Sequence, residues 1–179
     1  MITFSTPNQQ IEIDENQRVL VVGDGKLGQL VAQTLALTGC DLWAIGRHSE
    51  KLANLAARGI KIGLEADVQE RSFDIAVDCT GNPQGFDLAR RSLRPRGILV
   101  LKSTYAGKLT LDASALVVDE ITVIGSRCGP FAPALKLLEQ EKVDVKPLIH
   151  GRYTIDEGLK AFGIAQKRGI LKVLVEINH

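Results

Sequence analysis

RVLVVGDGKLG, residues 18–28, joins a run of aliphatic and β-branched residues to a glycine-rich turn. The run is typical of a buried strand. The turn has the pattern G-x-G-x-x-G, and from Leu27 apolar residues recur at three- and four-residue steps until Gly39, which indicates an amphipathic helix and its end. The stretch therefore predicts a strand, a tight turn and a helix, which is the opening unit of an α/β fold.

Apolar strands and helical patterns alternate along the rest of the chain. The predicted strands are 18–23, 41–46, 60–64, 73–81, 96–103 and 120–126, with helices between most of them. Such alternation favours a parallel sheet covered by helices on both faces. The predicted fold class is α/β, a Rossmann-type doubly wound six-stranded parallel sheet with a short C-terminal helix–strand tail.

Three segments follow from this pattern. Residues 1–16 form a polar N-terminal arm, residues 17–146 a dinucleotide-binding Rossmann domain, and residues 147–179 a C-terminal tail. The tail has a helical pattern over about 156–166 and a last apolar strand at 171–177.

Composition limits the class of protein. The 179 residues are 45% hydrophobic and 24% charged, with a net charge of +1, as in soluble globular proteins. The chain has no long basic run and only 4% aromatic residues, which argues against a nucleic-acid surface. It also has neither a signal pattern nor an apolar stretch near the roughly 18 residues that would span a membrane. Three widely spaced cysteines suggest packing residues in a cytoplasmic protein.

The glycine pattern predicts a phosphate-binding turn. Gly23 permits the tight turn, Gly25 removes a side chain that would block a pyrophosphate, and Gly28 allows the helix to pack closely on the sheet. Free N–H groups at the start of the helix, around Lys26 and Leu27, then face the phosphates. A plain tight turn without a ligand is the alternative, but the strand–turn–helix context favours a dinucleotide.

The end of the second strand bears on which dinucleotide binds. An acid usually stands there and bonds the ribose hydroxyls of NAD, but this chain has Gly46. Such an acid about 4 Å from the 2′-phosphate of NADP would repel it by on the order of 4 kcal/mol at an effective dielectric near 20. Gly46 removes that repulsion, and Arg47 offers a planar guanidinium for the phosphate. His48, Ser49 and Lys51 can add to the pocket, so the pattern favours NADP, with NAD as the alternative.

Four longer stretches carry a family resemblance. They are VLVVGDGKLGQLVAQTLALTG, DCTGNPQGFDLARRSLRPRGILVL, DEITVIGSRCGPFAPALKLLEQEKVDVKPLI, and YTIDEGLKAF before LKVLVEI. In this order, over about residues 17–177, they resemble the cofactor half of the zinc-type medium-chain alcohol and polyol dehydrogenases. In that family the dinucleotide domain is inserted into a GroES-like catalytic domain. The resemblance implies that the tail from about Pro147 returns to the catalytic domain.

The resemblance also implies cofactor contacts at the carboxyl ends of the later strands, where open parallel sheets bind their ligands. The positions implied over the cofactor and its nicotinamide are Thr80, Gly81, Ser103, Thr104, Gly125, Ser126 and Arg127. Lys172 matches a basic position that reaches the pyrophosphate.

The zinc ligands that the resemblance implies are not recognisable in this sequence. The resemblance places the cysteine, histidine and acidic or sulfur ligands of zinc before the nucleotide domain, where only residues 1–16 stand. His48, His150 and His179 are too scattered to replace them. No residue is therefore predicted to be catalytic or to bind a metal, and zinc is expected only in a full-length enzyme.

The predicted function is the NADP-binding domain of a zinc-dependent alcohol dehydrogenase-like oxidoreductase. Hydride would pass between an alcohol and the nicotinamide in the full enzyme, and this chain alone would be inactive. The alternative is a free-standing NAD(P)-sensing regulatory module, which would have no reason to keep the C-terminal tail. The strand near 120–126 would lie at a sheet edge, and an unpaired edge favours a homodimer, which the resemblance also implies.

Overall fold

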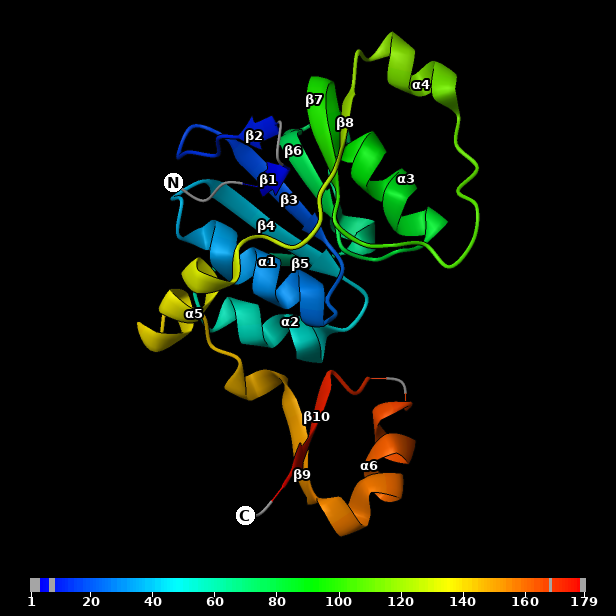
Figure 1. Ribbon diagram of the computed structural model, residues 1–179. Coiled ribbons are helices and arrows are strands. Elements are labelled where there is room, and N and C mark those ends of the chain that lie inside the picture. Colours follow the sequence, from blue (N-terminus) through cyan, green and yellow to red (C-terminus); the bar gives the residue numbers. More distant parts are fainter. Residues whose placement is uncertain (1–3, 7–8, 168, 178–179) are drawn as a thin grey trace. The chain divides into compact units, whose positions relative to one another are not determined.

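The computed structural model describes residues 4–6, 9–167 and 169–177 (Figure 1). The chain divides into two compact units, Met1–Val143 and Asp144–His179. The sequence predicts that the C-terminal tail begins at residue 147, whereas the second unit begins at Asp144.

Within the described residues, the first unit is built on a six-stranded sheet whose neighbouring strands all run parallel. Its order is β5 (Lys61–Leu64), β4 (Asp41–Gly46), β3 (Arg18–Val22), β6 (Phe73–Asp78), β7 (Leu93–Leu101) and β8 (Thr122–Gly125). From β3 the chain moves outward to β5, returns to β6 beside β3, and then moves outward to β8. This doubly wound order confirms the predicted fold class.

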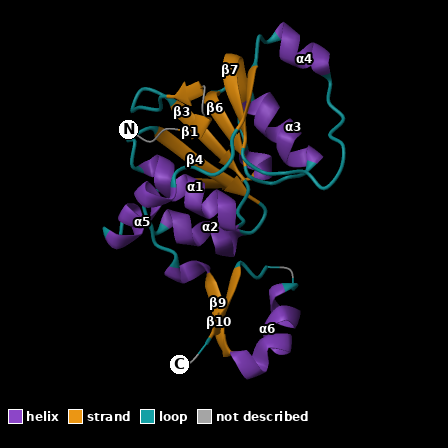
Figure 2. Cartoon of the chain, in the orientation of Figure 1, coloured by secondary structure: helices purple, strands orange, loops and turns teal. Residues whose placement is uncertain are grey.

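Helices cover both faces of the sheet (Figure 2). Successive side chains of a strand point to opposite faces, so Val19 and Val21 pack on one side while Leu20 and Val22 pack on the other. The first face is covered by α1 (Lys26–Ala36) and α2 (Ser49–Ala56), and the second by α3 (Pro83–Ser92). The main helix side chains in these clusters are Val31, Leu35, Leu52 and Leu55 on the first face, and Phe86, Leu88 and Ala89 on the second.

The helix ends follow local chemistry. Asn82 accepts a hydrogen bond from the Gly85 N–H at 2.9 Å and caps α3, whose first residue is Pro83. Gly39 and Gly59, with φ of 82° and 77°, follow α1 and α2 in the left-handed region that favours glycine. These signals were visible in the sequence. The short α4 (Ala113–Val118) was not predicted.

The N-terminal segment differs from the predicted polar arm. β1 (Phe4–Thr6) and β2 (Gln9–Ile11) form an antiparallel pair, and Ile11 and Ile13 are buried in the core cluster beside α1 and α2. The segment is polar in composition, but two isoleucines are enough to anchor its end. The last part of residues 1–16 therefore belongs to the packed domain.

The remaining elements are α5 (Phe131–Glu139) in the first unit and the whole of the second unit. The second unit has β9 (Ile149–Thr154) paired in parallel with β10 (Lys172–Glu176), and α6 (Gly158–Ala165) between them. Short 3₁₀ turns lie at Glu65–Asp67, Lys146–Leu148 and Ile155–Glu157. Across the described residues, no helix has the length and apolar character that crossing a membrane requires.

Candidate functional site

The glycine turn connects β3 to α1 at the point where the strand order reverses. Gly23 has φ of 119°, and its N–H donates to the Ile45 carbonyl at 2.8 Å. A side chain at Gly28 would overlap the carbonyl oxygen of Gly23, so the helix begins tightly against the turn. An added Cβ at Gly25 would meet nothing within 4 Å. The turn is thus closed on the protein side and open on the side where a phosphate would approach.

The start of α1 faces this open space. Gly25 is the N-cap of the helix, with Lys26 exposed and Leu27 half-buried in the first turn. The first N–H groups of a helix have no partner within the helix, and the helix dipole is positive there. The residues predicted to contact phosphate form this turn and the start of α1, and the contacts themselves remain a prediction; the residues are Gly23, Gly25, Lys26, Leu27 and Gly28.

Asp24 fills the space beside Gly46 at the end of β4. An ideal Cβ built at Gly46 would lie 2.5 Å from both Cβ and Oδ2 of Asp24. The space of a strand-end side chain is therefore occupied by a carboxylate that comes from the glycine turn. The sequence showed that the acid was missing at position 46, but not that another acid fills its place.

Four donor groups surround the Asp24 carboxylate. Its Oδ2 accepts hydrogen bonds from the main-chain N–H groups of Arg47 at 2.7 Å and His48 at 2.8 Å, and lies 2.9 Å from His48 Nδ1. The Lys51 ammonium lies 3.8 Å from Oδ1. Burial raises the pKa of Asp24, but the hydrogen bonds from His48 and Arg47 outweigh burial and hold this pKa below its ordinary value.

The main chain of Lys51 is also held by a hydrogen bond from α1. The side chain of Gln29, fully buried on α1, donates from Nε2 to the Lys51 carbonyl at 2.8 Å. Asp24 and Gln29 therefore both tie the first turn of α2 to the α1 side of the site. Neither was singled out in the sequence, because both act through contacts between residues more than twenty positions apart.

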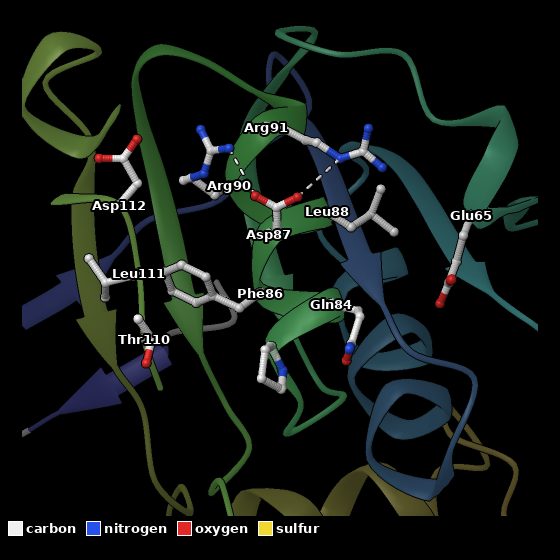
Figure 3. A pocket seen from close by; sticks show the side chains of 11 residues that line it. Glu65, Gln84, Phe86, Asp87, Leu88, Arg90, Arg91, Thr110, Leu111 and Asp112 are labelled. Carbon is white, nitrogen blue, oxygen red and sulfur yellow. Dashed lines mark hydrogen bonds and ion pairs between the residues drawn. The ribbon is translucent and has the colours of Figure 1, made fainter. Parts of the chain in front are cut away.

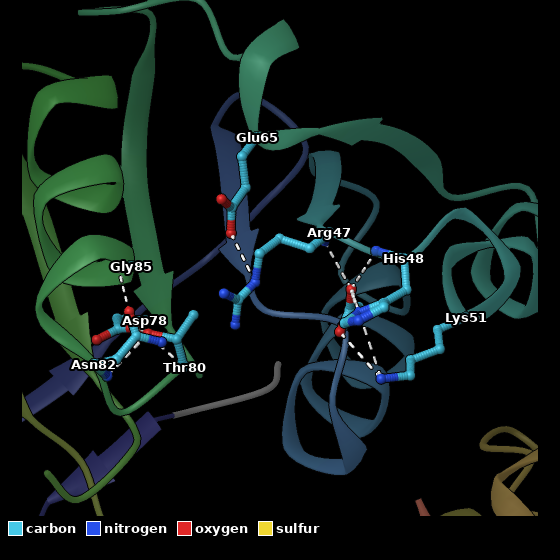
Figure 4. A network of polar contacts seen from close by, with 9 residues as sticks. Arg47, His48, Lys51, Glu65, Asp78, Thr80, Asn82 and Gly85 are labelled. Carbon is cyan, nitrogen blue, oxygen red and sulfur yellow. Dashed lines mark hydrogen bonds and ion pairs between the residues drawn. The ribbon is translucent and has the colours of Figure 1, made fainter. Parts of the chain in front are cut away.

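Arg47 points away from this cluster. Its side chain is 67% exposed, and Nε lies 3.6 Å from the carboxylate of Glu65 at the end of β5. Figure 4 shows Arg47 extending from the His48 side towards Glu65. An exposed ion pair at this distance is weak, so Glu65 holds the guanidinium only loosely.

The carboxyl end of β6 forms a second polar cluster. Asp78 is fully buried and accepts hydrogen bonds from the N–H of Thr80 at 2.8 Å and its hydroxyl at 2.6 Å, and from the hydroxyl of Tyr105. Gly81 has φ of 68°, and a Cβ there would lie 2.7 Å from the Thr104 carbonyl oxygen. The turn after β6 is therefore packed on the segment after β7.

These contacts bring several predicted residues together. Gly81, which directly follows Thr80, lies against Ser103 and Thr104, since a Cβ at Gly81 would be 3.4 Å from Ser103 Cβ. Lys102, directly after β7, connects this region to the segment after β8. Its ammonium donates to the Ser126 hydroxyl at 3.1 Å and to the Arg127 carbonyl, and both residues follow Gly125, the last residue of β8. Burial lowers the pKa of Lys102. Asp78, Lys102 and Tyr105 were missed because nothing in their local sequence marks them.

Lys172 lies on β10 in the second unit, where its side chain is exposed. Its contact with a pyrophosphate therefore remains a prediction.

A separate pocket of about 530 Å³ runs along α3 (Figure 3). It is lined by Glu65, Pro83, Gln84, Phe86, Asp87, Leu88, Arg90, Arg91, Thr110, Leu111 and Asp112. Both arginines are paired with acids: Arg90 with Asp87, and Arg91 with Glu70 and Asp87. None of the predicted cofactor residues lines this pocket, so the glycine turn and not this pocket is the candidate site.

The cysteines and acids do not form a metal centre in the part of the chain that the structure describes. There, no three His, Cys, Asp or Glu side chains are grouped so that they could hold a metal ion. Cys40 and Cys79 are buried, as predicted for packing residues, but Cys128 is exposed and that prediction is wrong for it. The described residues do not fit the ligand set of a catalytic zinc.

The fold and the site define a doubly wound α/β domain with a glycine turn at the switch point of its sheet. The chain belongs to the zinc-binding dehydrogenase family, whose model matches residues 27–140. A sorbitol dehydrogenase of Halalkalibacterium halodurans is 28% identical over 184 residues, covering 91% of this chain and 52% of that protein. An (R,R)-butanediol dehydrogenase of Neisseria gonorrhoeae is 26% identical and covers 89% of this chain and 50% of its own length.

Among solved structures, Staphylococcus aureus TarJ in complex with NADPH has the same fold, with a TM-score of 0.83 and 18% identity. The match covers 93% of this chain and 57% of TarJ. The chain thus spans about half the length of the curated relatives it matches.

Proposed function

We propose that this chain binds NADP(H) at the glycine turn and forms the cofactor-binding part of an alcohol dehydrogenase-like oxidoreductase. The observation that supports this most is the opening at Gly25, directly in front of the first turn of α1 and at the switch point of the sheet. The pyrophosphate would meet the N–H groups there, and the nicotinamide would extend towards the ends of β6, β7 and β8.

Arg47 supports NADP over NAD. It lies directly after the end of β4, its side chain is mostly exposed, and its guanidinium is paired with Glu65 at 3.6 Å. A guanidinium in this position can form two charge-assisted hydrogen bonds with a 2′-phosphate. The NADPH complex of TarJ, which shares the fold, agrees with this cofactor class.

The reaction is proposed from the relatives. Sorbitol and (R,R)-butanediol dehydrogenases suggest that the full enzyme interconverts a secondary alcohol and a ketone, with hydride transfer to or from the nicotinamide. The described residues bind and orient the cofactor but do not offer a zinc ligand set. We therefore expect this chain alone to bind the dinucleotide without oxidising an alcohol. No observation on the described residues favours the alternative of a free-standing sensor.

We also propose that two copies pair through β8. This strand is the last in the sheet, and Val123 on it is 41% exposed. A β-branched edge with open hydrogen-bonding groups favours pairing with a second edge. Sedimentation of the wild type and Val123→Lys at several concentrations tests this, with a dimer expected only for the wild type.

Titration of the purified chain with NADPH and NADH tests the cofactor assignment. We expect tighter binding of NADPH, and Arg47→Ala should weaken NADPH roughly 10- to 100-fold while leaving NADH within about twofold. Arg96→Ala is the matched control, since Arg96 is also exposed and paired with an acid, Glu120, at 3.1 Å. Equal affinities for the two nucleotides, or no effect of Arg47→Ala on NADPH, would contradict the assignment.

A further inference from the structure

We propose that Asp24 competes with the 2′-phosphate of the cofactor and so limits the preference of this site for NADP over NAD. Its carboxylate accepts hydrogen bonds from donor groups that would otherwise be available to the phosphate. This inference rests on the proposed function, because it concerns the same adenosine end of the dinucleotide.

The arrangement of donors supports the inference. Two consecutive main-chain N–H groups, those of Arg47 and His48, point at a single oxygen of Asp24, and His48 Nδ1 lies 2.9 Å from the same oxygen. Consecutive N–H groups that converge in this way form an anion-binding concavity. Here the anion is the protein's own carboxylate, on a side chain that is 11% exposed. The turn after β4 is therefore shaped for an anion and already filled.

The position of the carboxylate places it beneath the ribose end of the site. Because a Cβ at Gly46 would lie 2.5 Å from Asp24 Oδ2, the carboxylate stands where the usual strand-end acid would begin. A strand-end acid extends from that point towards the ribose hydroxyls, whereas Asp24 occupies the point itself. Because Oδ2 is engaged by Arg47 and His48 and Oδ1 lies 3.8 Å from Lys51, the carboxylate is already held by protein groups, and its charge would repel a phosphate brought to this turn.

The local charges balance without a phosphate. Arg47 pairs with Glu65, and Lys51 with Asp24, so the two cations are matched by two acids. A 2′-phosphate can displace the exposed Glu65 from Arg47. It cannot displace Asp24, which is buried and held by the turn. Removal of the Asp24 charge would leave Lys51 without its acid and the N–H groups less strongly engaged, and both changes favour a phosphate.

The sharpest test uses two nucleotides that differ only in the phosphate at issue. Adenosine 2′,5′-bisphosphate and AMP bind to the adenosine end alone, and calorimetry at low salt gives both affinities. Asp24→Asn keeps the shape of the side chain and one acceptor oxygen. We expect it to tighten the 2′,5′-bisphosphate about tenfold and to change the affinity for AMP less than twofold.

Asp41→Asn is the matched control. Asp41 lies at the other end of β4, where it is also paired with cations, Lys61 and Arg18. Its substitution removes the same charge far from the turn after Gly46, so both nucleotide affinities should stay within twofold. A gain of equal size in Asp41→Asn would show that net charge alone is responsible and would overturn the proposal.

The remaining outcomes separate the two proposals. If Asp24→Asn leaves the 2′,5′-bisphosphate unchanged or weakens it, the carboxylate does not compete and the inference fails. If the wild type binds AMP as tightly as the 2′,5′-bisphosphate, the NADP assignment fails, while a selective gain in Asp24→Asn still supports competition. If neither nucleotide binds to any of the proteins, both proposals fail. Should Asp24→Asn not fold by circular dichroism, Asp24→Ser is measured with the same pair.

Discussion

The hydroxyl of Tyr105 donates a hydrogen bond to the carboxylate of Asp78, a fully buried acid at the carboxyl end of β6. Burial, followed by this hydrogen bond, raises the pKa of Tyr105, so the phenol stays protonated and remains a donor. The bond ties the segment after β7 to the end of β6. It helps to hold the two turns between which the nicotinamide end of the cofactor would lie.

Tyr105→Phe removes this donor and should reduce the free energy of unfolding by about 1–3 kcal/mol, because a buried carboxylate loses one of its partners. Denaturant unfolding at neutral pH measures the change. Tyr153→Phe, in the second unit, serves as a control and should change stability by less than about 0.5 kcal/mol. Equal effects of the two substitutions would contradict the role of Tyr105.

Asp24 should make the stability of the first unit dependent on acid pH. Its pKa lies below the ordinary value of 3.8 in the folded chain, so its contribution is fully present above that value and is lost as pH falls through the lower folded pKa. The difference in unfolding free energy between the wild type and Asp24→Asn should therefore be largest near neutral pH and shrink below about pH 4. Denaturant unfolding at pH 7, 5 and 3 gives this difference. A constant difference would show that the charge of Asp24 does not contribute.

The three cysteines should differ in reactivity. Burial, with a smaller contribution from the neighbouring Asp78, raises the pKa of Cys79 to about 12, and burial also raises the pKa of Cys40. The thiolate is the reactive form, so both thiols should be inert in the folded protein, whereas Cys128 is exposed. At pH 8 a thiol reagent should label Cys128 within minutes and the other two only after unfolding. Rapid labelling of Cys79 in the folded chain would contradict its burial.

Asp24 and Gly46 should be energetically coupled. A Cβ at position 46 would meet Asp24 at 2.5 Å, and overpacking of this kind costs about 1–3 kcal/mol, which we expect for Gly46→Ala. In an Asp24→Gly background both the carboxylate and its Cβ are gone, so Gly46→Ala should have little effect. Unfolding of the four proteins gives the coupling, expected to exceed about 1 kcal/mol. Additive effects would contradict the contact.

Local sequence patterns predicted the scaffold well. The strand runs from β3 to β8 and the glycines that follow α1 and α2 depend on residues that are neighbours in sequence. The β1–β2 pair and the short α4 were missed, because a polar composition hides the two buried isoleucines at 11 and 13, and a six-residue helix has too few turns for a clear period.

The site was predicted less completely, and the reason is distance along the chain. Gly23, Gly25, Gly28 and Arg47 are marked by their places in a motif and at a strand end. Asp24 lies inside the same motif, but its partners are 23 and 24 positions away, at Arg47 and His48. Only the parallel pairing of β3 with β4 brings them together. A polar residue between two motif glycines, combined with a glycine at the next strand end, is the signal that could have revealed it.

The shared space of Asp24 and Gly46 also constrains how cofactor choice can change in evolution or in the laboratory. An exchange of NADP for NAD is commonly sought by placing an acid at the end of the second strand. In this chain that single step meets the existing carboxylate, so position 24 must change first. The order of the two substitutions therefore matters, because an acid placed first at position 46 would be destabilised by its contact with Asp24, and an acid placed there after Asp24 has been replaced would not.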